Sequence, residues 1–195
     1  MPAQLPKIPS PTAEIRGGAV IVAAFEPFEG RRKNRSWEAV SLVRAEIERV
    51  RLPVEFARLP ELVAPLAARA SVLLLVGEAR RRALSIERRA QNLIACRIAD
   101  NAGARPDGPI DAAGPGELAA TWDAERVLAA ARAAGAPAEL SDDAGGFCCN
   151  AALYHALAAA PPTARVGFLH VPIAPQPPLE VIARAIEAIL GTMST

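Results

Sequence analysis

The chain has 195 residues, of which 51% are hydrophobic, so it can bury a substantial core within one domain, and disorder of its body is excluded. Its 22 basic and 21 acidic residues leave a net charge of +1, which gives no electrostatic reason to bind nucleic acid or an anionic membrane. The three cysteines, two of them adjacent, do not resemble a disulfide framework and favour a reducing, cytoplasmic compartment. With two histidines and no metal-ligand spacing, the sequence predicts no metal site.

The chain begins with a proline-rich head, in which proline stands at positions 2, 6, 9 and 11. This head lacks the long apolar run that a signal peptide or a membrane span requires. We therefore predict a loosely ordered tail over residues 1–17 and one domain over residues 18–195.

The first half of that domain alternates strands and helices. Ala19–Phe25 is a continuous run of β-branched residues, alanine and phenylalanine, which is typical of a strand buried on both faces. After the loop that follows Phe25, we expect a helix that is capped by Asn34 or Ser36 and runs through Arg49. A short strand over Val54–Arg58, a helix over Glu61–Ala70 and an apolar strand over Ser71–Val76 are expected next. Such alternation predicts a parallel sheet with helices on both faces and a ligand site beyond the carboxyl ends of the strands.

The second half starts with a less regular segment. Leu84–Ile98 has no clean period and is interpreted as strand, and the glycine- and proline-rich stretch Asp100–Gly116 is predicted to be a long loop. The remaining elements are expected to be a helix over Thr121–Ala134, a strand over Ala138–Ser141, a helix reaching Ala159, a strand over Arg165–His170 and a helix over Pro178–Leu190.

A candidate nucleophile lies in the stretch DDAGGFCCNAALY, Asp142–Tyr154. Two glycines allow a sharp turn, and Cys149 then falls in the first turn of the next helix. Helix N-terminal N–H groups and the positive end of the macrodipole favour thiolate, which is the reactive form of cysteine. The alternative is that Cys149 is a small apolar residue of the core.

A cysteine nucleophile needs a base, and the chain offers two histidines. His155 follows Cys149 by six residues on the same helix, about 240° around its axis, so it points away from the sulfur. His170 ends a predicted strand and could lie beside the turn that carries Cys149. Its other interpretation is a hydrogen-bonded histidine of the core.

Five ordered segments carry a resemblance to a known family: AFEPFEGRRKNRSWEAV, SIERRAQNLIACRIADN, PIDAAGPG, SDDAGGFCCN and GFLHVP. In this order and at these spacings they resemble pyroglutamyl peptidase type I, from about Gly18 to Leu190. The resemblance implies an α/β fold, a single-domain three-layer α/β/α sandwich around a mostly parallel twisted sheet. It also implies a homo-oligomer.

The same resemblance implies roles for individual residues. Cys149 corresponds to the nucleophile, His170 to its general base, and Glu87 to the acid that orients the histidine. Arg97 corresponds to an arginine near the oxyanion site. The positions that correspond to the substrate pocket are Phe25, Phe28, Asn34, Glu78, Ile98, Phe147 and Cys148.

The implied substrates are small peptides with an N-terminal pyroglutamyl residue. A compact lactam without a charged amino group suits an apolar slot with one or two hydrogen bonds. The thiolate would attack the carbonyl that follows the lactam, and water would then hydrolyse the thioester. This chemistry requires no metal or organic cofactor.

The chain departs from the family around the pocket. Ala24 replaces a glycine, and the glycine-rich turn of the family reads GEARRR, residues 77–82. Glu78 stands there in place of a neutral glutamine. We expect its carboxylate to point outward to Arg80, Arg81 or Arg82, because an ion pair at a solvated rim avoids burying charge.

Two other function classes stay open. A cysteine hydrolase of the same fold could act on a different small amide or N-terminal group. A catalytically idle binding or assembly protein could also carry this sequence. Nucleotide binding is disfavoured, since no glycine-rich phosphate-binding motif follows a predicted strand.

Overall fold

The computed structural model describes residues 18–193, so the tail expected over residues 1–17 lies outside the described residues. Its centre is a six-stranded sheet whose order is β2-β1-β3-β10-β4-β9. These strands are β1 (Ala19–Phe25), β2 (Glu48–Leu52), β3 (Ala70–Ala79), β4 (Leu84–Glu87), β9 (Ala138–Ser141) and β10 (Arg165–Pro172). Strands β2, β1, β3 and β10 are parallel to one another, whereas β4 and β9 run the opposite way.

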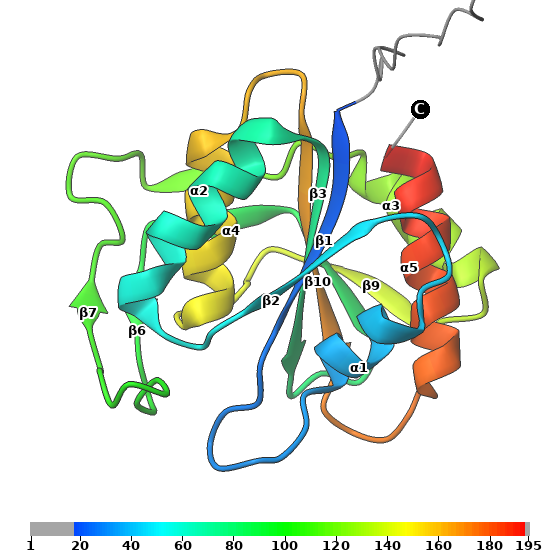
Figure 1. The fold of residues 1–195 in the computed structure, drawn as a ribbon, viewed down its shortest axis with the longest axis horizontal. Coiled ribbons are helices and arrows are strands. Elements are labelled where there is room, and N and C mark those ends of the chain that lie inside the picture. The colour runs from blue at the N-terminus through cyan, green and yellow to red at the C-terminus, as the bar shows by residue number, and fades with distance from the viewer. Residues whose placement is uncertain (1–17, 194–195) are drawn as a thin grey trace, which may run out of the picture.

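Helices cover both faces of the sheet, as Figure 1 shows with the sheet seen nearly edge-on. One face packs against α2 (Leu59–Arg69) and α4 (Cys148–Ala159). The other packs against α1 (Arg35–Leu42), α3 (Ala124–Ala133) and α5 (Leu179–Met193). The expected three-layer α/β/α sandwich with a mostly parallel sheet is therefore confirmed.

The buried strands follow from their composition. β1 and β3 are nearly continuous apolar runs, because each lies inside the sheet and has a helical layer on both sides. Along β3, Leu73 and Leu75 face the α2 and α4 layer, whereas Leu74 and Val76 face the other layer. The two cores are thus built from alternate residues of the same strands.

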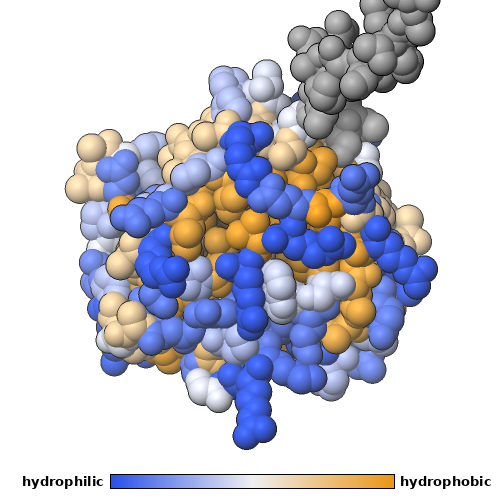
Figure 2. Space-filling model, viewed as in Figure 1, coloured by the Kyte–Doolittle hydropathy of each residue, from blue (hydrophilic) through white to orange (hydrophobic). Residues whose placement is uncertain are grey.

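The predicted helix through Arg49 was too long, and the strand expected over Val54–Arg58 was wrong. Helix α1 ends at Leu42, β2 follows, and the next element is a short 3-10 helix over Phe56–Arg58. β2 was missed because its sequence, ERVRL, is mostly charged. It is an edge strand, where charged side chains are tolerated and guard against pairing with another chain. On the face of the molecule that is turned toward the viewer in Figure 1 and Figure 2, hydrophilic side chains run across the middle between apolar areas.

The segment interpreted as one strand over Leu84–Ile98 is three short strands. β4 joins the main sheet, β5 (Arg89–Gln91) pairs with β8 (Glu117–Ala119), and β6 (Ile94–Ala95) pairs with β7 (Asp107–Gly108). Most of the stretch from Asp100 to Gly116 is loop, as predicted. This excursion lies on the α4 side of the sheet, and β7 is at its outer edge in Figure 1, whereas Ala95 of β6 donates its backbone N–H to the carbonyl of Gly146 at 2.9 Å.

The carboxyl ends of β1, β3 and β10 meet at one edge of the sheet, where ligands bind in folds of this kind. The loop after β1 closes over that edge and ends at Asn34, which caps α1 by accepting the backbone N–H of Ser36 at 3.0 Å. Within residues 18–193, no helix is long and apolar enough to cross a bilayer.

Candidate active site

The thiol of Cys149 is positioned by the start of α4. Phe147 is the N-cap residue, so Cys149 lies in the first turn, as predicted. Its Sγ lies over Gly77 of β3, because a β carbon built on that glycine would come within 2.7 Å of the sulfur. Gly77 is also the register partner of His170 on β10. The sulfur and the imidazole therefore lie above neighbouring positions of the sheet.

His170 and Glu87 are joined directly. Glu87 is the register partner of Phe168, two residues before His170, so their side chains share the α4 face of the sheet. Nδ1 of His170 lies 2.8 Å from Oε1 of Glu87, and both side chains are buried. Glu87 is 0% exposed, so its carboxylate is shielded from solvent where it meets the imidazole.

Cys149 reaches this pair from a strand that is not adjacent to β10. Strand β9, which precedes the cysteine loop, does not neighbour β10, because the antiparallel β4 lies between them. The loop 142–147 instead crosses β4, turning at Gly145, whose φ of 82° favours glycine, and at Asp143, which accepts the N–H of Gly145 at 2.9 Å.

The expectation of a helix-stabilised thiolate is not supported by the surroundings of the sulfur. Burial, and after it the carboxylates of Glu87 and Glu78, raise the pKa of the Cys149 thiol to about 12. A helix N-terminus contributes roughly 0.3–1 kcal/mol, which is less than one pKa unit and cannot offset this burial. A thiol whose pKa is raised in this way must pass its proton to a base when it attacks.

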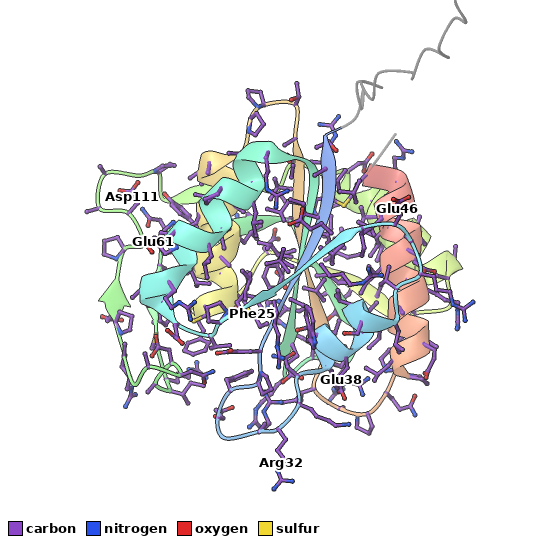
Figure 3. The ribbon with its side chains drawn as sticks, viewed as in Figure 1. Phe25, Arg32, Glu38, Glu46, Glu61 and Asp111 are labelled. Atoms are coloured by element: carbon purple, nitrogen blue, oxygen red, sulfur yellow. The ribbon has the colours of Figure 1, made fainter. Side chains whose placement is uncertain are left out.

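A pocket of about 260 Å³ opens beside the thiol and the imidazole. Most of the residues expected to bind substrate line it, namely Phe25, Phe28, Asn34, Glu78, Phe147 and Cys148. Phe147 anchors an aromatic wall, with ring centroids 6.1 Å from Phe28 and 5.3 Å from Phe56. Figure 3 shows Phe25 at the end of β1 and Arg32 projecting away from the loop that follows.

Asn34 serves this pocket through a fixed orientation. Its Nδ2 donates to the carbonyl of Glu26 at 2.9 Å, and its Oδ1 accepts from the Ser36 hydroxyl at 2.7 Å. Because both ends of the amide are engaged, Asn34 holds the loop between β1 and α1 as one wall of the pocket.

The expected outward orientation of Glu78 was wrong. Its side chain is 1% exposed, its Oε2 accepts the backbone N–H of Arg35 at 2.9 Å, and its Oε1 forms an ion pair with Arg31. The arginines that follow it do not take this role. The strand β3 continues to Ala79, so the pleat turns Glu78 toward the loop after β1 rather than toward solvent.

Arg97 and Ile98 do not line this pocket. Both line a neighbouring groove that shares Gly145 and Phe147 with the pocket, and the Arg97 side chain is exposed. They follow the short strand β6, which places them on the outer excursion rather than over the main sheet. The assignment of Arg97 to the oxyanion stays a prediction.

The roles of three residues of the site were not predicted from the sequence. Gly77 makes room for the sulfur, and Arg31 is the counterion of Glu78. Asn150 follows Cys149 and is fully buried, and its Nδ2 donates to the carbonyls of Gln91 at 2.7 Å and Leu93 at 2.9 Å. A buried asparagine inside an apolar helix is the one signal that could have found Asn150.

Comparisons with known proteins agree with this arrangement. The family model of pyroglutamyl peptidase matches residues 18–191. A pyrrolidone-carboxylate peptidase of Erwinia tasmaniensis is 43% identical over 170 residues, covering 80% of this chain and 79% of its own. One of Thermococcus onnurineus is 34% identical over 194 residues, covering 89% and 97%. The crystal structure of pyrrolidone carboxyl peptidase from Thermus thermophilus matches with a TM-score of 0.84 and 35% identity, covering 89% of this chain and 99% of that chain.

Proposed function

This chain belongs to the pyroglutamyl peptidase family, and from that premise we propose that Cys149, His170 and Glu87 are the triad with which it removes N-terminal pyroglutamyl residues from peptides. The observation that carries the proposal is the 2.8 Å contact between His170 Nδ1 and Glu87 Oε1, in the pocket wall that also holds the Cys149 thiol. A carboxylate on Nδ1 leaves Nε2 as the nitrogen that exchanges a proton with the substrate and the thiol.

The reaction follows from these positions. Nε2 of His170 takes the thiol proton as Sγ attacks the carbonyl between the pyroglutamyl residue and the next amino acid. The first-turn N–H groups of α4 have no acceptor within the helix and can stabilise the negative oxygen that forms. His170 then protonates the leaving amine, and water, deprotonated by the same imidazole, hydrolyses the thioester. These residues supply every group that the steps require, so we propose no cofactor.

The pocket supports a lactam as the group recognised. Its walls are mainly aromatic and aliphatic, and its volume of about 260 Å³ is small. A pyroglutamyl residue is compact and uncharged, so it can enter such a space without leaving an unpaired charge. A free amino terminus would bring a cation against Phe25, Phe28 and Phe147, with the carboxylate of Glu78 already held by Arg31.

The test is hydrolysis of a pyroglutamyl coumarin amide by the wild type, Cys149→Ser and the control Cys96→Ser. We expect the first substitution to abolish turnover, whereas the control should retain it, because Cys96 lies outside the pocket. Hydrolysis of aminoacyl amides but not the pyroglutamyl amide would favour the hydrolase of different specificity. If Cys149→Ser still hydrolyses the amides that the wild type hydrolyses, the proposed triad is contradicted.

We also propose that the enzyme works in the cytoplasm and forms a homo-oligomer. The cytoplasmic location is supported by the free thiols of Cys96, Cys148 and Cys149, two of which line or adjoin the catalytic centre and need a reducing environment. The oligomer rests on the family resemblance, and size-exclusion chromatography with light scattering tests it.

A further inference from the structure

A second hollow adjoins the catalytic pocket. This leaving-group groove encloses about 750 Å³, and its lining includes Leu93, Arg97, Ile98, Gly145 and Phe147. Gly145 and Phe147 also line the catalytic pocket, and Phe147 precedes the nucleophile by two residues. We propose that the part of the substrate beyond the scissile bond lies in this groove, and that Arg97 binds a carboxylate there.

The first step of the argument is continuity. If the pyroglutamyl ring fills the small pocket and its carbonyl lies at the Cys149 sulfur, the next residue must leave the pocket beside that sulfur. The shared wall formed by Gly145 and Phe147 leads directly into the groove. This inference rests on the proposed function, since it assumes that the ring occupies the pocket.

The groove is held rigidly to the nucleophile. Asn150, the residue after Cys149, donates to the carbonyls of Gln91 and Leu93 and accepts the N–H of Gln91 at 2.9 Å. Both residues line the groove. A fixed distance between the reacting sulfur and the groove is what a binding subsite for the leaving group requires.

The charges of the groove single out Arg97. Arg89 pairs with Glu117 at 3.1 Å, and Asp142 accepts from Arg88 at 2.9 Å. Asp143 is used by the local turn, through the N–H of Gly145. The side chain of Arg97 is exposed, and within residues 18–193 its guanidinium has no hydrogen-bond or ion-pair partner. The backbone carbonyl of Arg97 accepts a hydrogen bond from the Arg105 guanidinium at 2.9 Å.

The substrate supplies the matching charge. A pyroglutamyl dipeptide with a neutral second residue has one ionised group, its terminal carboxylate, because the lactam removes the amino charge. An acidic side chain after the pyroglutamyl residue presents the same chemistry. A guanidinium binds carboxylates well, through its fork of N–H donors. An exposed contact of this kind corresponds to about a two- to fivefold effect on kcat/KM.

Four substrates separate the sources of the carboxylate. Pyroglutamyl-alanine is compared with its amide, and pyroglutamyl-aspartyl amide with pyroglutamyl-asparaginyl amide, each as kcat/KM at low ionic strength. We expect the wild type to prefer the carboxylate member of at least one pair about two- to fivefold. Arg97→Gln should bring that ratio close to one, and Arg97→Lys should keep part of it. Because screening shortens the reach of exposed charges, 1 M NaCl should also reduce the wild-type ratio.

The matched control is Arg165→Gln, which removes the same charge from the exposed start of β10, at the opposite end of that strand from His170. It should leave the ratios unchanged. If the kcat/KM ratio is near one in both substrate pairs for the wild type, the inference is overturned. It is also overturned if Arg97→Gln lowers kcat/KM equally on all four substrates, a result that would instead favour the oxyanion role of Arg97. Hydrolysis of the two neutral amides establishes the proposed function separately. If no substrate is cleaved, the proposed function and this inference both fail.

Discussion

The sulfur of Cys149 lies over Gly77, so close that a β carbon on that glycine would stand 2.7 Å from Sγ. The same β carbon would stand 2.8 Å from the Phe168 ring. The absence of a side chain at this point of β3 is therefore what allows the Cys149 thiol to approach the sheet beside His170, the register partner of Gly77.

Gly77→Ala should consequently impair catalysis. The added methyl pushes the sulfur away from the imidazole, and a displacement of about 1 Å can lower kcat about 100-fold. The control is Gly116→Ala, because a β carbon on Gly116 meets nothing within 4 Å. Steady-state kinetics and thermal unfolding of both variants check this, and an unchanged kcat in folded Gly77→Ala would contradict it.

Glu87→Gln should lower kcat by about 10³-fold or more, since the amide no longer favours the tautomer that presents a basic Nε2. Glu87 is buried, but the substitution keeps its volume, so the thermal midpoint should change far less than activity does. The measurement is kcat beside circular dichroism melting. A nearly normal kcat would show that the contact with His170 is only structural.

The raised pKa of Cys149 predicts a particular pH dependence of alkylation. The thiolate is the form that reacts. As long as the pH is below the pKa, the thiolate fraction grows about tenfold for each unit by which the pH rises. Iodoacetamide labelling of Cys149 should thus keep accelerating up to pH 10, with Cys149→Ser giving the background from the other thiols. A rate that levels off between pH 6 and 8 would instead indicate a thiolate paired with a protonated His170.

The sequence anticipated the parts of this fold that burial dictates. β1, β9 and the helix that begins with the cysteines were predicted nearly to the residue, because apolar runs and glycine turns are local signals. β2 was not, because an edge strand needs no apolar run. The crossing of the cysteine loop over β4 could not be read either, since strand order in a sheet is a tertiary property.

For the candidate site too, some features were predicted from the sequence and others were not. The three residues proposed as the triad and six of the seven expected substrate-binding residues come together, but their positions followed from the resemblance rather than from spacing. Glu78 was misjudged because its partner, Arg31, is distant in the sequence and the choice between partners depends on which way the β3 pleat turns. Local charge density favoured the arginines that follow it.

The buried pair of Glu78 and Arg31 predicts non-additive stability changes. Arg31→Met leaves a carboxylate that is 1% exposed without its counterion, which should lower the free energy of unfolding by about 2 kcal/mol. That is below the range for fully buried pairs, because the Arg31 side chain is 29% exposed. Adding Glu78→Gln should restore part of the loss, since Gln can still accept the N–H of Arg35.

Denaturant unfolding of the two single variants and the double variant measures this coupling. Arg32→Met is the control, because the neighbouring arginine projects into solvent and should be neutral (Figure 3). Additive losses would contradict the pairing. Because the Arg31 guanidinium lies 4.4 Å from the centre of the Phe28 ring, Arg31→Met should also raise KM.

Trp122 links the core to Glu87, and Gly167 makes room for the indole ring. The indole Nε1 donates to the backbone carbonyl of Glu87 at 3.2 Å, and a β carbon on Gly167 would overlap the indole ring. Gly167→Ala should therefore destabilise the protein by about 1–3 kcal/mol through overpacking, a fall of several degrees in thermal midpoint. Displacement of the ring also releases the end of β4, so kcat should fall as well.

A second glycine provides the opposite case. Gly191 lies in α5, exposed, where a β carbon meets nothing within 4 Å. Gly191→Ala should leave the thermal midpoint unchanged or raise it, because alanine is the better helix former by up to about 1 kcal/mol. Differential scanning calorimetry and kcat of the two variants make the comparison. If Gly167→Ala unfolds at the wild-type temperature, the indole can move aside without cost and does not hold β4 in place.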